Sequence, residues 1–132
     1  MNACRVKIVT DTDGERSVFT AEGNAEFSDD SLSVNYLQEG DETTLNLSGD
    51  SLIMMRRGRE SAMSVEFRND SDTALNLVFG ENEAKIPVHT VFFQKIQKRE
   101  SIFIALDYEL RFPENSQLFS LKIFIQSISE EK

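Results

Sequence analysis

Cross-linking cysteines are missing from this sequence, in which Cys4 is the single cysteine. One cysteine cannot form an internal disulfide, so we expect a protein of a reducing compartment, most simply the cytoplasm. Cys4 has no histidine near it in the sequence and lies in an alternating stretch. It is therefore predicted to be an ordinary strand residue and not a reactive thiolate, which needs local tuning of its pKa.

Long apolar runs and an excess of positive charge are also missing. No window approaches the ~18 apolar residues of a membrane-spanning helix, and the first fifteen residues contain no run typical of a signal peptide. The formal net charge is -9. Nucleic-acid binding depends on neutralising phosphates with Lys and Arg, so this charge argues against nucleic acid and against anionic membrane surfaces.

Catalytic and metal-binding motifs are scarce. His89 is the single histidine, and its position in the alternation of "PVHTV" points it outward. No serine lies in a nucleophile motif and no glycine-rich phosphate loop is present. One His and one Cys far apart do not suggest zinc. The sequence therefore predicts no catalytic residue, no metal and no cofactor, and favours a protein that is not an enzyme.

The sequence does contain a persistent alternation of apolar and polar residues, which is typical of half-buried strands. No stretch is a convincing long amphipathic helix, and no linker divides the chain, so residues 1–132 are predicted to form one domain. The apolar positions that share a face are Val6 and Ile8; Leu32, Val34 and Tyr36; Leu45 and Leu47; Met63, Val65 and Phe67; Leu75, Leu77 and Phe79; Ile86, Val88, Thr90 and Phe92; and Ile102, Ile104, Leu106, Tyr108 and Leu110.

Turn signals separate these runs. They are "DTDGE", "SDDS", "EGDE", "SGDS", "RRGRE", "RNDSD", "FGEN", "QKRES" and "FPENSQ". Successive hairpins predict an antiparallel meander whose edges must be hidden, and closure does this. We therefore predict an all-β fold, a closed antiparallel up-and-down β-barrel of about eight to ten strands. A two-sheet sandwich is the alternative.

The basic segment "LIMMRRGRE" ends one predicted strand in an otherwise acidic chain. If strands alternate in direction, its turn shares a barrel end with four acidic turns. Arg57 and Arg59 would then balance surface charge. Alternatively Arg56 points inward with Leu52 and Met54, near the barrel mouth, where its guanidinium must be paired with a carboxylate of the protein or of a ligand. Alternation alone does not decide between Arg56 and Arg57.

The second strand, "SVFTAEGNAEF", has small residues in the middle of its inner face. Gly23 lies between Ala21 and Ala25 and is flanked by Phe19 and Phe27. Gly23 marks either a strand bend that helps to close the barrel or space for a small ligand.

On the opposite faces of the last strands, Phe93, Phe103, Phe124 and Leu118 could form an outer apolar patch. Such a patch suggests a homodimer or another protein partner.

The order of several short motifs resembles the YwiB-like family of uncharacterised bacterial proteins. These motifs are "YLQEG", "TTLNLSGDSLIMMRRG", "MSVEF", "FG", "HT" and "IALDYEL". The positions that match the family pattern are Tyr36, Thr44, Arg56, Gly58, Gly80, Thr90 and Tyr108. The resemblance implies a calycin-like, lipocalin-type barrel and a bacterial cytoplasmic setting, and it implies no established activity.

Two hypotheses about function follow. In the first, the barrel binds a small, partly apolar and anionic ligand. Arg56 pairs with its charge, Tyr108 and Thr90 supply hydrogen bonds, and Tyr36 lines the wall. In the second, the protein is a non-catalytic interaction module that uses its outer Phe-rich face in a homodimer or with another protein.

Overall fold

The computed structural model describes residues 2–28 and 31–128 and forms ten β-strands there, without a helix. The strands are β1 (Asn2–Thr12), β2 (Glu15–Phe27), β3 (Ser31–Gln38), β4 (Asp41–Ser48), β5 (Ser51–Arg57), β6 (Ser61–Arg68), β7 (Ser71–Phe79), β8 (Asn82–Gln97), β9 (Ser101–Arg111) and β10 (Ser116–Ser127). The predicted turns lie between these strands, although Asp29 and Asp30 of one turn are outside the described residues. No helix of the described part is long and apolar enough to cross a membrane.

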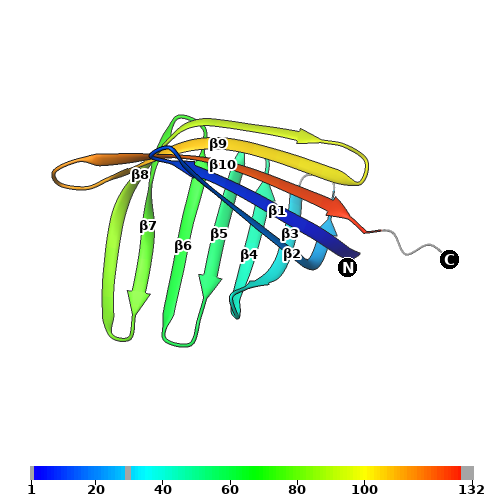
Figure 1. Cartoon of the computed structure of the whole chain (residues 1–132), viewed down its shortest axis with the longest axis horizontal. Helices are drawn as coiled ribbons and strands as arrows, with labels where there is room; N and C mark the ends of the chain where they lie inside the picture. The colour runs from blue at the N-terminus through cyan, green and yellow to red at the C-terminus, as the bar shows by residue number, and fades with distance from the viewer. Residues whose placement is uncertain (1, 29–30, 129–132) are drawn as a thin grey trace.

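Each strand pairs antiparallel with its neighbours in the sequence, and β1 pairs with β10. The predicted closed up-and-down barrel is thus confirmed. In Figure 1, β9, β10, β1 and β2 run across the view and β3 to β7 run down it, while β8 follows β7 and then bends to run across beside β9. The barrel wall is therefore strongly bent, with two groups of strands that cross each other.

The hydrophobic core lies on the inner face that the alternation predicted. Val6, Val34, Ile104 and Ile123 are completely buried. The ladders place such residues in rows around the barrel, for example Leu32, Leu47, Leu52 and Phe67 on adjacent strands. These rows fill the end that carries the β2–β3, β4–β5, β6–β7 and β8–β9 turns, which we call the closed end. Lys95 reaches across it to the Gly49 carbonyl (2.9 Å).

The opposite end, with the β1–β2, β3–β4, β5–β6, β7–β8 and β9–β10 turns, is less completely paired; we call it the open end. Among the described residues, β2 pairs with β3 only over Asn24–Phe27, so residues 15–23 pair with β1 alone. Likewise β8 pairs with β9 only from Val88 onward, and residues 82–87 pair with β7 alone. The wall is therefore split at two places near the open end.

Gly23 lies where the β2–β3 ladder begins. A Cβ atom there would lie 2.1 Å from the carbonyl oxygen of Asn35 and 2.9 Å from Cβ of Tyr36. Contacts of this length to backbone do not occur, so only glycine lets β2 pass this closely over β3. Of the two interpretations of Gly23, the structure therefore favours the one in which it shapes the barrel.

Three predictions of side-chain direction are wrong. Phe92 was expected inside and Phe93 outside, but Phe92 is 43% exposed and Phe93 packs against the core. The cause is a β-bulge, in which Thr90 pairs with Tyr108 and Phe92 with Asp107, so that Val91 is an extra residue. Phe79 was also expected inside; it is 52% exposed because the β7–β8 hairpin extends beyond the part of the barrel that β9 covers.

Candidate functional site

A cavity of about 480 Å³ occupies the open end of the barrel. Its walls come from strands on both sides of the interior and include parts of β2 and β3 where these two strands have separated. The lining residues are Ile8, Thr10, Ser17, Val18, Phe19, Tyr36, Gln38, Glu39, Met54, Arg56, Met63, Val65, Phe67, Leu75, Tyr108, Leu110, Phe119 and Leu121. Barrels of this size are either filled by side chains or hold one small molecule. Here one end is filled and the other is hollow.

Aromatic rings line opposite walls of this cavity. On one wall the ring of Tyr36 lies 5.8 Å from that of Phe19. On the other, Tyr108 lies 4.7 Å from Phe67 and is stacked on Phe119 at 5.1 Å, with 9° between the ring planes. Such contacts fix the rings in place, so the wall is preformed and largely apolar.

The two tyrosines also bring hydroxyl groups into this apolar space. Tyr36 and Tyr108 were both predicted as site residues, and both line the cavity. Burial raises the pKa of each to about 12, and for Tyr36 the nearby Arg56 charge acts in the opposite direction. Each hydroxyl therefore stays protonated at neutral pH and can donate a hydrogen bond.

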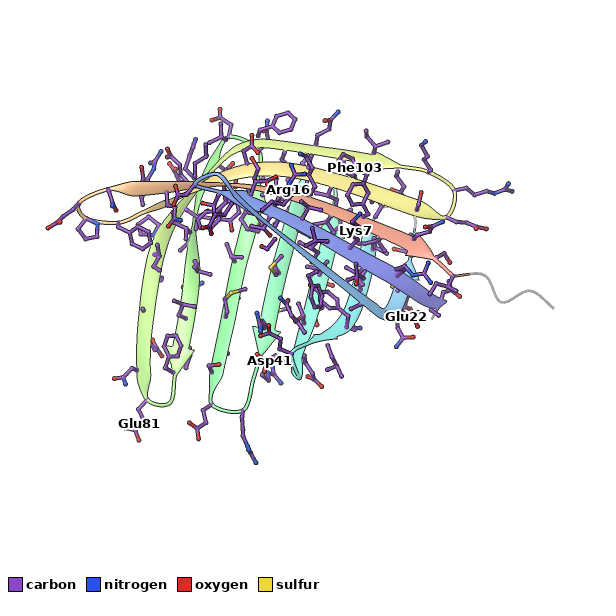
Figure 2. The ribbon with its side chains drawn as sticks, viewed as in Figure 1. Lys7, Arg16, Glu22, Asp41, Glu81 and Phe103 are labelled. Carbon is purple, nitrogen blue, oxygen red and sulfur yellow. The ribbon has the colours of Figure 1, made fainter. Side chains whose placement is uncertain are left out.

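Arg56 is the arginine that points inward, together with Leu52 and Met54, whereas Arg57 is exposed. The question that alternation left open is thus decided for Arg56, which lines the cavity. Its Nε donates to Oδ2 of Asp41 at 3.1 Å, and Nη2 lies 3.6 Å from Oε1 of Glu39. The protein supplies the predicted carboxylate itself, from the β3–β4 turn and the start of β4 (Figure 2).

Gly58 explains the Arg-x-Gly step of the sequence. A Cβ atom at this position would come within 2.9 Å of Oδ1 of Asp41. The Asp41 carboxylate therefore packs directly over the backbone that follows β5, which positions it beside Arg56. The side chains of Arg56 and Asp41 are only 30% and 32% exposed, so this pair is more shielded than the ordinary surface pairs.

Thr90 is completely buried and is the direct cross-strand partner of Tyr108. Its Oγ1 has no hydrogen-bond partner among the described residues. Thr90 does not line the cavity, so the structure places it beside Tyr108 on the inner face and outside the cavity lining. The four predicted site residues thus form two pairs, Tyr36 with Arg56 on one wall and Tyr108 with Thr90 on the other.

Thr43 was not predicted and occupies an equivalent place on the first wall. It is 2% exposed, pairs with Tyr36 on one side and Arg56 on the other, and its Oγ1 also lacks a partner in the described part of the chain. Thr44, which matched the family pattern, points outward and donates to Oδ1 of Asn35 at 2.8 Å. The signal for Thr43 was present, because it shares the face of Leu45 and Leu47.

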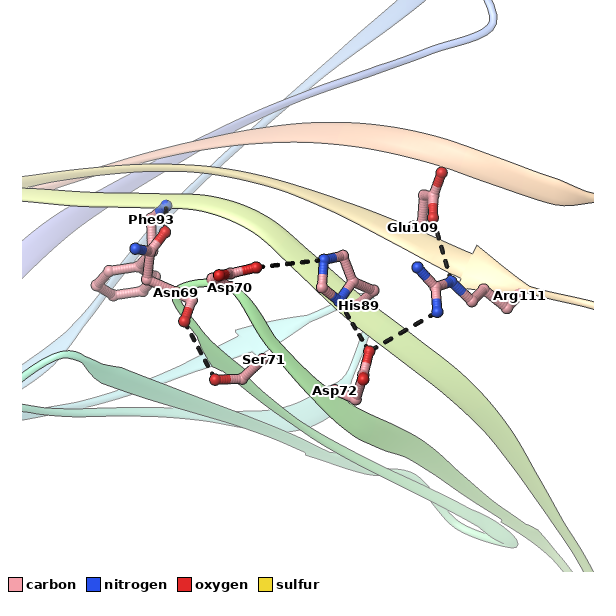
Figure 3. Close-up of polar contacts among 8 residues, drawn as sticks. All are labelled: Asn69, Asp70, Ser71, Asp72, His89, Phe93, Glu109 and Arg111. Carbon is pink, nitrogen blue, oxygen red and sulfur yellow. Dashed lines mark hydrogen bonds and ion pairs between the residues drawn. The ribbon is translucent and has the colours of Figure 1, made fainter.

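His89 lies on the outer face, away from the cavity, as predicted. Its Nδ1 lies 2.8 Å from Oδ1 of Asp72, and Figure 3 shows Asp70 on the other side of the ring and Arg111 near Asp72. These polar contacts connect β7, β8 and β9. No group of three His, Cys, Asp or Glu side chains suited to a metal ion occurs among the residues that the structure describes.

Comparison with known proteins gives a family and a fold. Residues 3–123 match the model of a domain of unknown function, DUF1934. The chain belongs to the DUF1934 family. A crystal structure of the YwiB protein from Bacillus subtilis is similar to this DUF1934 barrel, with a TM-score of 0.76 and 20% sequence identity over 96% of this chain and 91% of that chain. The resemblance noted in the sequence is confirmed. No curated protein matches the sequence.

Proposed function

We propose that this DUF1934 barrel binds a small, largely apolar molecule that carries a carboxylate or similar acceptor group. The observation that carries the proposal is the preformed cavity of about 480 Å³ at one end of a barrel whose other end is filled. This volume lies within the range of sites for small organic ligands. Lipocalin-type barrels hold a small ligand in a hollow interior of this kind. We propose that this barrel is calycin-like in the same sense.

The polar groups of the cavity suggest where the acceptor group lies. Asp41 uses only Nε of Arg56, and Glu39 approaches Nη2 at 3.6 Å, too far for a hydrogen bond, while its side chain is 82% exposed. A ligand carboxylate can therefore take the place of Glu39 on the guanidinium. Tyr36, on the same wall, donates a second hydrogen bond. Charge-assisted hydrogen bonds to a guanidinium are strong when they are partly shielded from water.

The apolar part of the ligand then lies against the rings of Phe67, Tyr108 and Phe119 and beside Met54 and Met63. Thr43 and Thr90 lie beside Tyr36 and Tyr108 on the adjacent strands and are not part of the cavity lining. We propose binding without catalysis, because His89 lies on the outer face and the described residues that line the cavity include neither histidine nor cysteine. A reducing, cytoplasmic setting belongs to this proposal, since Cys4 is the single cysteine of the sequence and is a free thiol.

Matched ligands test this proposal. Native mass spectrometry of freshly purified protein will show whether a small molecule co-purifies. Titration with medium-chain fatty acids and with alcohols of the same length is then followed by tyrosine fluorescence. We expect the acids to bind more tightly, and Arg56→Met to weaken acid binding by roughly tenfold to a hundredfold, because it removes hydrogen bonds to a charged group.

The control variant is Arg57→Met, which changes the neighbouring, outward arginine and is expected to leave binding unchanged. Thermal unfolding of each variant separates a loss of binding from a loss of folding. Absence of binding by every acid and alcohol, or equal binding of acids and alcohols, would contradict the proposal.

The alternative function, an interaction module, is supported by an apolar patch on the outer surface. This patch is smaller than the sequence suggested. Phe103 and Phe124 contact each other at 4.8 Å between ring centroids, and Ile96 pairs with Phe103. Ile96 and Phe124 are 43% and 40% exposed. Phe93 is not part of this patch, because it faces inward. If this face mediates assembly, Phe124→Ser will reduce the mass measured by light scattering.

A further inference from the structure

The free edge of β2 is the longest unpaired strand edge beside the cavity. Residues 15–23 pair with β1 on one side, and no described residue pairs with them on the other. Alternate residues therefore present backbone N–H and C=O groups that lack a strand partner. Exposed edges of this kind are templates for another strand, and proteins commonly protect them with Lys, Pro, bulges or a covering segment.

The second free edge shows such protection and the β2 edge does not. Residues 82–87 of β8 contain Lys85 and Pro87, and proline removes a hydrogen-bond donor from the edge. Residues 15–23 of β2, "ERSVFTAEG", contain neither Lys nor Pro. The edge is well exposed, with Val18 at 56%. One edge is thus blocked, while the other is suited to pairing.

The sequence of the β2 edge is complementary to itself. If two copies pair antiparallel about Phe19, then Arg16 of one copy lies opposite Glu22 of the other, and Val18 lies opposite Thr20. Arg16 and Glu22 lie toward opposite ends of this segment (Figure 2), as this pairing requires. Both symmetry-related charge pairs are attractive, and opposite charges directly across an antiparallel ladder are favourable.

The neighbouring strand extends this pattern of charges. Within one copy, Asp11 of β1 pairs with Arg16 (2.8 Å), and Arg5 of β1 lies 3.8 Å from Glu22. A row across two copies would therefore contain Asp11 and Arg16 of the first copy, followed by Glu22 and Arg5 of the second copy. Its charges alternate in sign over four strands. No such alternation would arise for a partner of arbitrary sequence.

We propose that the free edge of β2 is a homodimer interface, in which residues 16–22 of two copies pair antiparallel about Phe19. The interface differs from the outer apolar patch on β8, β9 and β10, and it does not depend on the ligand proposal. Because Ser17, Val18 and Phe19 also line the cavity, the dimer brings the β2 walls of two cavities together.

Complementary charge reversals test the interface. Light scattering and native mass spectrometry of the full chain are expected to show a dimer. Glu22→Arg and Arg16→Glu should each raise its dissociation constant by roughly tenfold or more, because two attractive pairs become repulsive. A mixture of the two variants should form a heterodimer, since both charge pairs between the two copies are again attractive. Native masses distinguish this heterodimer from either homodimer.

Two controls accompany these variants. Arg57→Glu changes an exposed arginine of β5, outside the β2 edge, and Phe124→Ser changes the outer patch; both are expected to leave the dimer intact. Circular dichroism checks that every variant is folded. A monomeric wild-type protein, a dimer that resists both charge reversals, or a dimer that Phe124→Ser dissociates would each overturn the proposal.

Discussion

The identities of several residues at the open end follow from the space and the strand register around them. Gly23 permits a backbone contact that no other residue allows, and Gly58 leaves room for the Asp41 carboxylate beside Arg56. Alternation restricted the inward arginine to Arg56 or Arg57, but the choice depended on the β4–β5 register, in which Arg56 lies opposite Thr43. Sequence predicted the types of residue in the site, and the register decided which of them face the cavity.

The tyrosines give a prediction about pH. Tyr36 and Tyr108 are the only tyrosines and the chain lacks tryptophan, so tyrosinate absorbance reports on these two residues alone. Their pKa in the folded protein is raised to about 12 from an ordinary value of 10. Between these values the unfolded chain loses protons that the folded protein keeps. The contribution of each tyrosine to the free energy of unfolding should therefore be fully present below pH 10. It should be lost as the pH rises toward 12, which lowers the free energy of unfolding by about 2 kcal/mol per tyrosine.

Alkaline titration of absorbance, with and without denaturant, measures both states. Tyr108→Phe should remove one of the two raised transitions and reduce the loss of unfolding free energy over this pH range. Midpoints near 10 in the folded protein would show that the rings are more hydrated than the structure indicates.

At the scale of elements, the strands were predictable because each has one buried face. Period two identifies such a strand even without knowledge of its partners. It does not identify a bulge, because an extra residue changes the direction of all later side chains in the strand without changing composition. Val91 therefore caused the error at Phe92 and Phe93. Phe79 was misplaced for a different reason, since alternation continues in the β7–β8 hairpin where no wall remains to cover it.

Because of the bulge, we expect β8 to tolerate the deletion of Val91 better than the deletion of a residue that is paired in the ladder. Removal of Val91 leaves Thr90 and Phe93 facing inward and Phe92 outward, because Val91 has no partner in the ladder. Removal of Gln94, which pairs with Ala105, reverses the directions of the residues that follow it and turns Lys95 away from the closed end. Urea unfolding should show that the Val91 deletion costs less stability than the Gln94 deletion, by about 1–3 kcal/mol. Equal costs would contradict this assignment of the extra residue.

For the whole molecule, the contrast between the closed and open ends determines where both proposed activities lie. The closed end contains the continuous rows of buried side chains, and its ladders include every strand. The open end contains the cavity, the Arg56 and Asp41 pair, and both free edges. Local opening requires the least free energy where backbone hydrogen bonds are few and apolar burial is small. The features available for binding thus occur together in the part of the barrel that is held least tightly.

Amide hydrogen exchange tests this arrangement and the dimer together. Amides of Val34, Leu45, Ile104 and Ile123, all at most 1% exposed, should exchange slowly, near the rate set by global unfolding. Amides on the free edges of residues 15–22 and 82–87 should exchange fast in dilute protein. As the protein concentration rises, the β2 amides should become protected while those of β8 do not, because only the β2 edge acquires a partner strand. Equal exchange at the two edges at every concentration would mean that the β2 edge stays unpaired, and that the barrel works as a monomer.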